Sequence, residues 1–289
     1  MEMDYVDVVL RLPLEDGACD ILKKALDIKR WSTSALSSAS GVEWARIERI
    51  LAMGDPTPEE LAGLAGTLGL RIEPLLAIQA GWRPGPRTLP WLGICGFATP
   101  FLDWTVNSFV VWDPDEGTAG VVDTGTDASP MLEFLEARGL GVSHIFLTHG
   151  HSDHVSRLQA VRERYPDAEV WHGVEEQVPC TDGRVVRAGM EAAIGRIRVR
   201  VLETPGHTPG SLTFWASGWP EESAGVAFVG DLVFAGSIGR PSHSYELLQQ
   251  SLHEGILRLP GETLLGCGHG PYTTVAEELE GNPVVNALL

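Results

Sequence analysis

Lysine and cysteine are scarce in this chain of 289 residues. All three lysines (Lys23, Lys24, Lys29) lie near the N-terminus, which leaves arginine as the only permanent cation in the rest. The four cysteines are far apart and form no CxxC pair, which excludes a disulfide framework and a thiolate zinc site. No apolar run reaches the ~18 residues of a membrane span, and the acidic start is unlike a signal peptide. We therefore expect a cytoplasmic protein.

Acidic residues outnumber basic ones by 39 to 21, which gives a net charge of −18. This charge repels nucleic acids, phospholipid surfaces and other polyanions at long range unless a local basic patch overrides it. With 44% hydrophobic and 21% charged residues, the composition is that of a globular protein, so disordered and fibrous classes are excluded.

A change of composition near residue 83 predicts two domains of different class. Apolar residues in 1–82 recur at helical spacing, and Thr57 followed by Glu60 predicts a capping box before a Leu-rich helix. The Pro- and Gly-rich start of 83–104 predicts a linker and entry segment. Residues 105–289 alternate β-rich runs with helical ones, which predicts an α/β domain. The predicted strands are 107–112, 119–123, 144–148, 169–172, 197–204, 212–215, 226–229 and 263–266, and the predicted helices 130–138, 157–165 and 244–258.

The element order in 1–82 resembles the helix-turn-helix domain of the Cro/C1 repressor family, with its turn at Gly41. In that family the helix after the turn reads bases in the major groove. Here its first residues include Glu43, Trp44 and Arg46, and the region holds 13 acidic against 8 basic residues. A carboxylate is a poor partner for phosphates, so we predict a dimerisation or docking module, with DNA binding as the alternative. A homodimer is expected from the resemblance alone.

Four candidate metal ligands follow a predicted buried strand within six residues: His149, His151, Asp153 and His154. Imidazole together with carboxylate suits zinc, iron or manganese rather than calcium, which takes oxygen ligands only. An extended backbone directs His149 and His151 to one side, whereas Asp153 and His154 lie one turn later and can face a second ion.

Three further candidates each lie between a strand and a Gly or Pro turn. His207 comes 56 residues after His151, Asp231 a further 24 and His269 a further 38. Any one of them alone is a weak signal, but together with the preceding motif they form a strong set.

This set resembles the metallo-β-lactamase superfamily, which implies an αββα sandwich with metals at one edge between the sheets. The resemblance implies that His149, His151 and His207 hold one ion, that Asp153, His154 and His269 hold the second, and that Asp231 bridges them. Asp123 is implied to support the ligand loop. Two zinc ions, or iron or manganese, would then activate a bridging hydroxide for hydrolysis. Asp153 would orient this hydroxide in addition to binding the metal.

The segments 230–240 and 268–274 resemble type II glyoxalases, which implies hydrolysis of a small thioester or ester. A thiolate leaves without strong general-acid help, which suits such a site. Arg240 and Tyr272 are predicted substrate contacts. One alternative is a persulfide dioxygenase with a single iron on His149, His207 and Asp231. Lactone hydrolysis and a DNA-binding regulator with a metal-containing sensor domain are the others.

Overall fold

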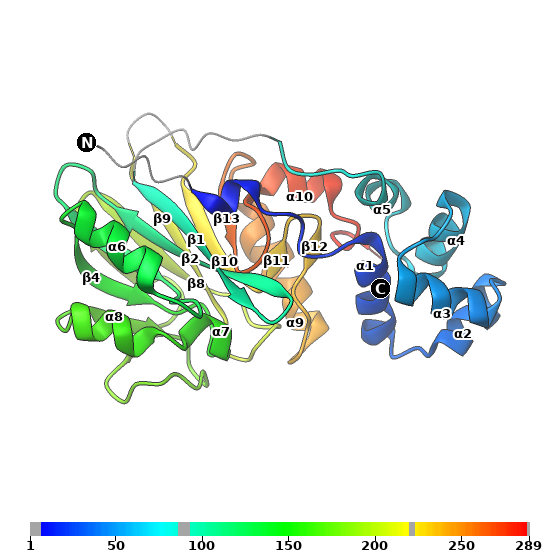
Figure 1. Ribbon diagram of the computed structural model, residues 1–289, viewed down its shortest axis with the longest axis horizontal. Helices are drawn as coiled ribbons and strands as arrows, with labels where there is room; N and C mark the ends of the chain where they lie inside the picture. The colour runs from blue at the N-terminus through cyan, green and yellow to red at the C-terminus, as the bar shows by residue number, and fades with distance from the viewer. Residues whose placement is uncertain (1–6, 86–92, 220–222, 288–289) are drawn as a thin grey trace.

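The computed structural model describes residues 7–85, 93–219 and 223–287 (Figure 1). In this part of the chain, five α-helices precede the sheets: α1 (Ala18–Lys29), α2 (Thr33–Ser40), α3 (Trp44–Met53), α4 (Pro58–Leu68) and α5 (Ile72–Gln79). Ser32 caps α2 by accepting from the Ala35 amide, and Thr57 and Glu60 form the predicted capping box of α4. The helical prediction for this region is confirmed, although the element order alone does not establish a DNA-binding fold.

Two six-stranded sheets stack in the rest of the molecule (Figure 1). The first has the order β1 (Ile94–Phe101), β2 (Trp104–Trp112), β3 (Thr118–Val122), β4 (Gly141–Phe146), β5 (Glu169–His172) and β6 (Arg184–Val185). The second has the order β14 (Thr273–Thr274), β13 (Leu264–Cys267), β10 (Val226–Gly230), β9 (Leu212–Ser217), β8 (Ile197–Glu203) and β7 (Glu191–Ile194). A small hairpin, β11 (Val233–Phe234) with β12 (Ser237–Ile238), follows β10.

Three hydrophobic clusters show how the layers pack. Residues of both sheets, Phe109 and Phe146 from one and Phe214 and Phe228 from the other, meet in the middle. The outer face of the first sheet is covered by α6 (Ser129–Ala137) and α8 (Leu158–Arg164). The outer face of the second is covered by α9 (Tyr245–Gln250) and α10 (Val275–Gly281), in one cluster with α1 to α5. The predicted αββα layering is therefore present, and the N-terminal helices share a core with it.

Two segments differ from the sequence-based expectation. The entry segment 83–104 contains β1, which pairs with β2 over eight residues and so belongs to the sandwich. The predicted helix 244–258 is broken into α9, a π-turn (Ser251–Gly255) and a 3₁₀ turn (Ile256–Arg258). Within the described ranges, no helix is both long and apolar enough to span a membrane.

Residue Val9 is buried between the two sheets, although the sequence pattern placed it in the N-terminal domain 1–82. It lies in a 3₁₀ turn (Val8–Arg11) that packs against β1. The carboxylate of Asp7 accepts from the Gly96 amide and from the Tyr272 hydroxyl, and this fixes the chain start to β1. The described N-terminus thus crosses the sandwich before the helices begin.

Candidate metal centre

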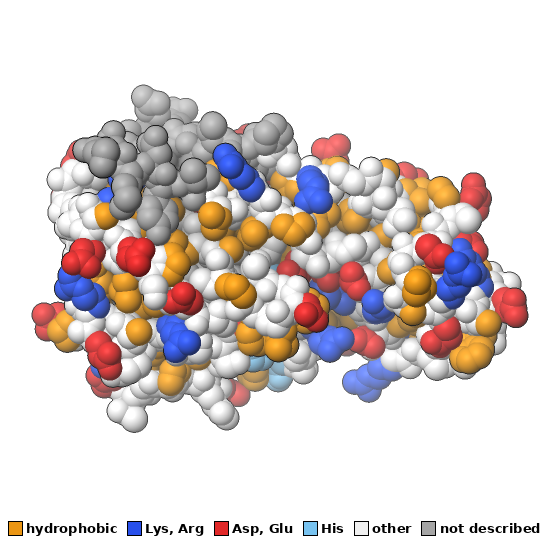
Figure 2. Space-filling model, in the orientation of Figure 1, with side chains coloured by type: hydrophobic (Ala, Val, Ile, Leu, Met, Phe, Trp, Pro, Cys, Tyr) orange, Lys and Arg blue, Asp and Glu red, His pale blue; other side chains and the backbone are white. Residues whose placement is uncertain are grey.

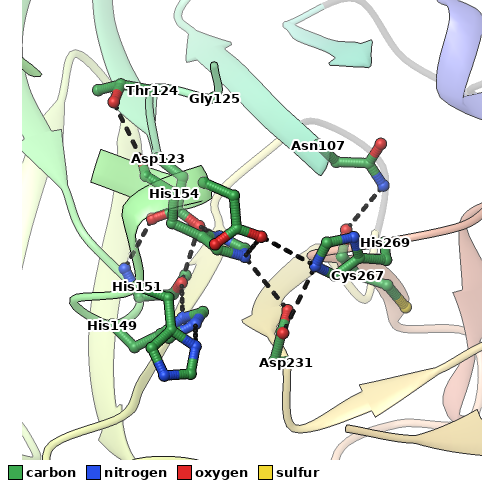
Figure 3. A network of polar contacts seen from close by, with 12 residues as sticks. Asn107, Asp123, Thr124, Gly125, His149, His151, His154, Asp231, Cys267 and His269 are labelled. Carbon is green, nitrogen blue, oxygen red and sulfur yellow. Dashed lines mark hydrogen bonds and ion pairs between the residues drawn. The ribbon is translucent and has the colours of Figure 1, made fainter. Parts of the chain in front are cut away.

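The predicted ligands come from four loops that begin where strands of the two sheets end. His149, His151, Asp153 and His154 follow β4 and enter the short helix α7 (Ser152–Val155), and His207 lies between β8 and β9. Asp231 and His269 follow β10 and β13, which are adjacent and parallel. Because the carboxyl ends of parallel strands meet at the same sheet edge, Asp231 and His269 lie side by side (Figure 3).

One ligand group gathers three imidazoles and a carboxylate. His149 Nε2 lies 3.1 Å from His151 Nδ1, which in turn lies 3.0 Å from His207 Nε2. The Oδ2 atom of Asp231 lies 3.5 Å from His207 Nε2. Each of the four residues offers one ligand atom, and these four atoms all lie within 4.8 Å of one another.

A second group lies on the other side of Asp231. It consists of Asp153, His154 and His269, whose ligand atoms are also within 4.8 Å of one another. His269 Nε2 is 3.4 Å from Asp153 Oδ2 and 3.5 Å from Asp231 Oδ2. His154 Nε2 is 3.3 Å from Asp231 Oδ1. Asp231 therefore contacts both groups. Figure 3 shows its carboxylate facing His154 and His269.

The donor atoms in these groups fit metal ions. The Nδ1 atoms of His149 and His207 bond to Thr148 Oγ1 and to the Arg240 carbonyl, so their Nε2 atoms present lone pairs to the cluster. Converging lone pairs about 3 Å apart repel each other unless a cation lies between them. In addition, the buried atoms His154 Nε2 and Asp231 Oδ1 form no hydrogen bond with any residue that the structure describes. A bound cation would satisfy both observations.

Charge in the cluster is arranged to stabilise a cation. Burial lowers the pKa of His154 and His269. The negative charge of the nearby carboxylates, chiefly Asp231, raises the pKa of both by more than burial lowers it. The pKa of His154 is raised to about 10 and that of His269 to about 11. Burial also opposes ionisation of Asp231, yet these two histidines hold its pKa well below its usual range. The site therefore favours positive charge, from a metal ion or from protons.

Asp123 bonds to the loop that carries His149 and His154. Its carboxylate accepts from the Thr148 amide at 2.8 Å, from Thr148 Oγ1 at 2.7 Å and from His154 Nδ1 at 2.7 Å. These bonds direct His154 Nε2 into the cluster and, through Thr148 Oγ1, His149 Nε2 as well. Gly268 is required nearby because a Cβ there would lie 2.2 Å from Asp231 Oδ1.

Comparison with known proteins agrees with the fold and with this site. The family model described as the metallo-beta-lactamase superfamily matches residues 102–269, which is more than half of the chain. The chain belongs to the metallo-beta-lactamase superfamily. The hydroxyacylglutathione hydrolase GloC of Haemophilus influenzae is 31% identical over 211 residues, which are 65% of this chain and 96% of that protein.

Solved structures of the superfamily resemble the same part of this chain. The BLEG-1 B3 metallo-beta-lactamase superposes with a TM-score of 0.59 at 28% identity, covering 66% of this chain and all of that one. ETHE1 from Myxococcus xanthus gives a TM-score of 0.57 at 28% identity over 66% of this chain and 84% of its own. TTHA1623, solved in a di-iron-bound form, gives 0.54 at 29% identity over 65% of this chain and 98% of its own.

The two predicted substrate contacts differ in this superfamily member: Tyr272 is buried, whereas the Arg240 side chain is exposed. Tyr272 is 2% exposed, packs on Phe109 in the inter-sheet core and donates its hydroxyl to Asp7, which contradicts a substrate contact. The Arg240 side chain is exposed and pairs with Asp27 of α1 at 3.2 Å. Arg240 nevertheless serves the site through its carbonyl, which accepts from His207 Nδ1 at 2.7 Å.

Two residues that the sequence pattern did not single out brace the ligand loops. Asn107 on β2 donates to the carbonyls of Cys267 and Gly270, which lie on either side of His269. Glu176, in the loop after β5, accepts from the amides of Gly150 and Gly210 and so joins the loops of His151 and His207. Asn107 is a polar residue at the start of a predicted buried strand, and this position could have indicated a structural hydrogen bond. Glu176 lies in a run of polar residues, where nothing in the sequence indicated a bracing role.

Proposed function

We propose that this protein is a dinuclear metal-dependent hydrolase of small thioesters, similar to type II glyoxalases. The observation that carries the proposal is that two compact ligand groups share Asp231. His149, His151 and His207 would hold one ion with Asp231. Asp153, His154 and His269 would hold the other.

Bound metal ions would supply a hydroxide nucleophile at neutral pH and would polarise the substrate carbonyl. The protein's own residues fix where this chemistry occurs. Asp123 and the carbonyls of Thr105 and Arg240 orient His154, His269 and His207 through their Nδ1 atoms. Asp153, with Oδ2 at 3.4 Å from His269 Nε2, would ligate and would also hold the attacking water.

A thioester is the substrate class that best suits these residues. A thiolate leaves without a proton donor, whereas an amine needs one, and the seven cluster side chains are all committed as ligands. The similarity to the hydroxyacylglutathione hydrolase GloC supports the same class. The acyl group and the thiol are not fixed by this argument.

A second candidate is a mononuclear iron persulfide dioxygenase. His149, His207 and Asp231 offer two imidazoles and one carboxylate, which is the ligand set of non-haem iron oxygenases. The likeness to TTHA1623 in its di-iron-bound form shows that a relative accepts iron. The second ligand group favours the hydrolase, because one iron would leave Asp153, His154 and His269 without a metal ion.

Metal content and activity of anaerobically purified protein test these alternatives. We expect two metal ions per chain and release of thiol from a panel of thioesters. Asp153→Ala should lower kcat more than about 100-fold, whereas the exposed control Asp167→Ala should keep it. A folded Asp153→Ala protein with unchanged kcat would contradict the mechanism. One iron per chain with oxygen uptake on glutathione persulfide would instead support the dioxygenase.

For the helical region we propose a docking role rather than DNA binding. Arg46 of α3 is held by Glu60 and Asp55, and Arg49 pairs with Asp55, so both arginines of this helix are engaged within the chain. Figure 2 shows that basic side chains over this region lie beside acidic ones. Direct binding to duplex DNA is tested by an electrophoretic shift at low salt. A specific shift would overturn the docking proposal.

A further inference from the structure

The β11–β12 hairpin that follows Asp231 is too short to hold its own position. Its two strands pair through two residues each, Val233 with Ile238 and Phe234 with Ser237. An isolated two-stranded hairpin is at best marginally stable in water, so contacts with the rest of the protein must fix it. The position of Phe234, which lies on β11, is therefore set by groups outside the hairpin.

Side chains from two different parts of the chain anchor this hairpin. Glu278 and Asn282, near the end of α10, bond to the backbone of its turn and of β12. Lys24 of α1 donates its ammonium to the Ile238 carbonyl of β12 at 2.7 Å. In Figure 1, α1 stands between this hairpin and helices α2 to α4. The N-terminal helical region thus supplies one of the anchors.

The Lys24 side chain is only 14% exposed, and its ammonium has three partners. It forms an ion pair with Asp16, bonds to the Ile238 carbonyl and lies 5.0 Å from the centre of the Phe234 ring. A buried ion pair adds little net stability, because the desolvation of both charges offsets their attraction. The arrangement that the ammonium fixes is therefore a stronger reason for a lysine at this position than stability is.

The Phe234 ring connects Lys24 with the metal ligand His269. Phe234 is buried, and its ring centroid lies 5.5 Å from that of His269, with the two planes at 84°. The bond from His269 Nδ1 to the Thr105 carbonyl fixes one atom of the imidazole, whereas the tilt of the ring depends on what packs against it. Because edge-to-face packing has a preferred geometry, a shift of Phe234 would change the direction of His269 Nε2.

We propose that Lys24 is a positioning residue for His269, through which helix α1 sets the affinity of the ion in the second ligand group. The proposal rests on the dinuclear centre of the proposed function. Lys24 acts through Phe234 and the hairpin, and it contacts neither the ligand atoms nor the substrate. The helical region thereby contributes to metal binding without supplying a ligand.

Lys24→Met tests the proposal because it removes the ammonium and keeps an unbranched, flexible side chain. Chelator competition on the metal-loaded protein measures the affinity of each of the two ions. Loss of a direct partner of a ligand weakens metal binding about 10- to 100-fold, and Lys24 acts one contact further away. We therefore expect one affinity to fall about fivefold and the other to stay within about twofold. Lys23→Met is the matched control, because Lys23 lies on the same helix and pairs with Asp20 at the surface, and it should change neither affinity.

A double-mutant cycle tests whether Lys24 acts through Phe234. Phe234→Leu removes the ring that contacts both Lys24 and His269, and it should weaken the same ion about tenfold. Lys24→Met should then add less than about twofold to this loss, because its route to His269 is already interrupted. Lys24→Gln, which keeps a donor for the Ile238 carbonyl, is a second variant and should show the same unequal effect to a smaller extent.

A purely structural role for Lys24 would give a different result. Both affinities would then fall together with the free energy of unfolding of the metal-free protein in urea, and this result would overturn the proposal. Two unchanged affinities in Lys24→Met and Lys24→Gln, or additive losses in the cycle, would overturn it as well.

The measurement needs no substrate, which separates this proposal from the proposed function. A wild-type protein that binds two ions but hydrolyses no thioester would refute the proposed function and leave the two affinities to judge Lys24. A wild-type protein that binds a single ion would refute both.

Discussion

Asp123→Asn removes the acceptor that orients His154 while leaving every ligand of the cluster in place. The wild-type carboxylate accepts three hydrogen bonds, two from Thr148 and one from His154, all at 2.7–2.8 Å. An asparagine oxygen can still accept from the Thr148 amide, but its NH₂ group then faces two donors, Thr148 Oγ1 and His154 Nδ1. His154 consequently loses the partner that fixes its tautomer, and Nε2 no longer presents its lone pair to the cluster.

The expected loss is about 10- to 100-fold in metal affinity, or about 1.4–2.7 kcal/mol. Complete loss of the two hydrogen bonds to Asp123 Oδ2 would lower the metal affinity by more than this. The loss is smaller because the His154 ring can rotate and bond to another group. The loss should fall on the ion held by Asp153, His154 and His269, since the other group contains no direct partner of Asp123.

Competition with a chelator, followed by metal counting per chain, measures both affinities. Wild type should retain two ions where Asp123→Asn retains about one. Asp127→Asn is the matched control, because Asp127 lies on the same loop and, among the described residues, bonds only to Ser129 at the start of α6. Two equally tight ions in Asp123→Asn would refute the reasoning.

Three further substitutions test the bracing of the site and of the core. Glu176→Ala disconnects the loops of His151 and His207 and should weaken the first ion about tenfold in the same chelator assay, with Glu175→Ala unchanged. Asn107→Ala leaves two buried carbonyls beside His269 without donors and should lower the free energy of unfolding by about 2–4 kcal/mol in urea; a loss below 0.5 kcal/mol would contradict this. Burial raises the pKa of Glu278 from 4.5 to about 7, so its folded form prefers the proton. Stability should therefore fall as pH rises from about 4.5 to about 7, by up to about 1.4 kcal/mol per pH unit, and level off above pH 7. Glu278→Gln should remove that part of the pH dependence, as followed by thermal unfolding between pH 5 and 9.

Most regular elements could be predicted because their signals are local. The Thr57–Glu60 capping box and the helix spacing around it fix α4, and the β-branched and aromatic run 169–172 coincides with β5. Strand β1 was not predicted, since Gly96 and Pro100 lie inside it and weaken any strand signal. Strand β1 is stabilised by its pairing with β2. Such pairing depends on both strands, so the residues of β1 alone predict it only weakly.

The metal ligands could be predicted for a different reason. Their residue types are costly to bury without a cation, and all seven follow strands, so convergence was the physically reasonable expectation. The side chain of Tyr272 was placed wrongly beside the site because proximity in sequence to His269 does not fix the direction of a side chain. The braces Asn107 and Glu176 act across loops that are far apart in sequence, so only the folded topology reveals them.

The contacts of the helical region argue that it folds and works as part of the hydrolase. It shares one hydrophobic cluster with α9, α10 and the outer face of the second sheet. At its end, the Arg71 guanidinium donates to the carbonyls of Leu279, Glu280 and Asn282 and so neutralises the C-terminal end of α10. At its beginning, Lys24 holds the hairpin that follows Asp231. A module fixed at both ends and packed between them is not free to rotate on a linker, so it keeps a constant position relative to the hairpin that follows Asp231.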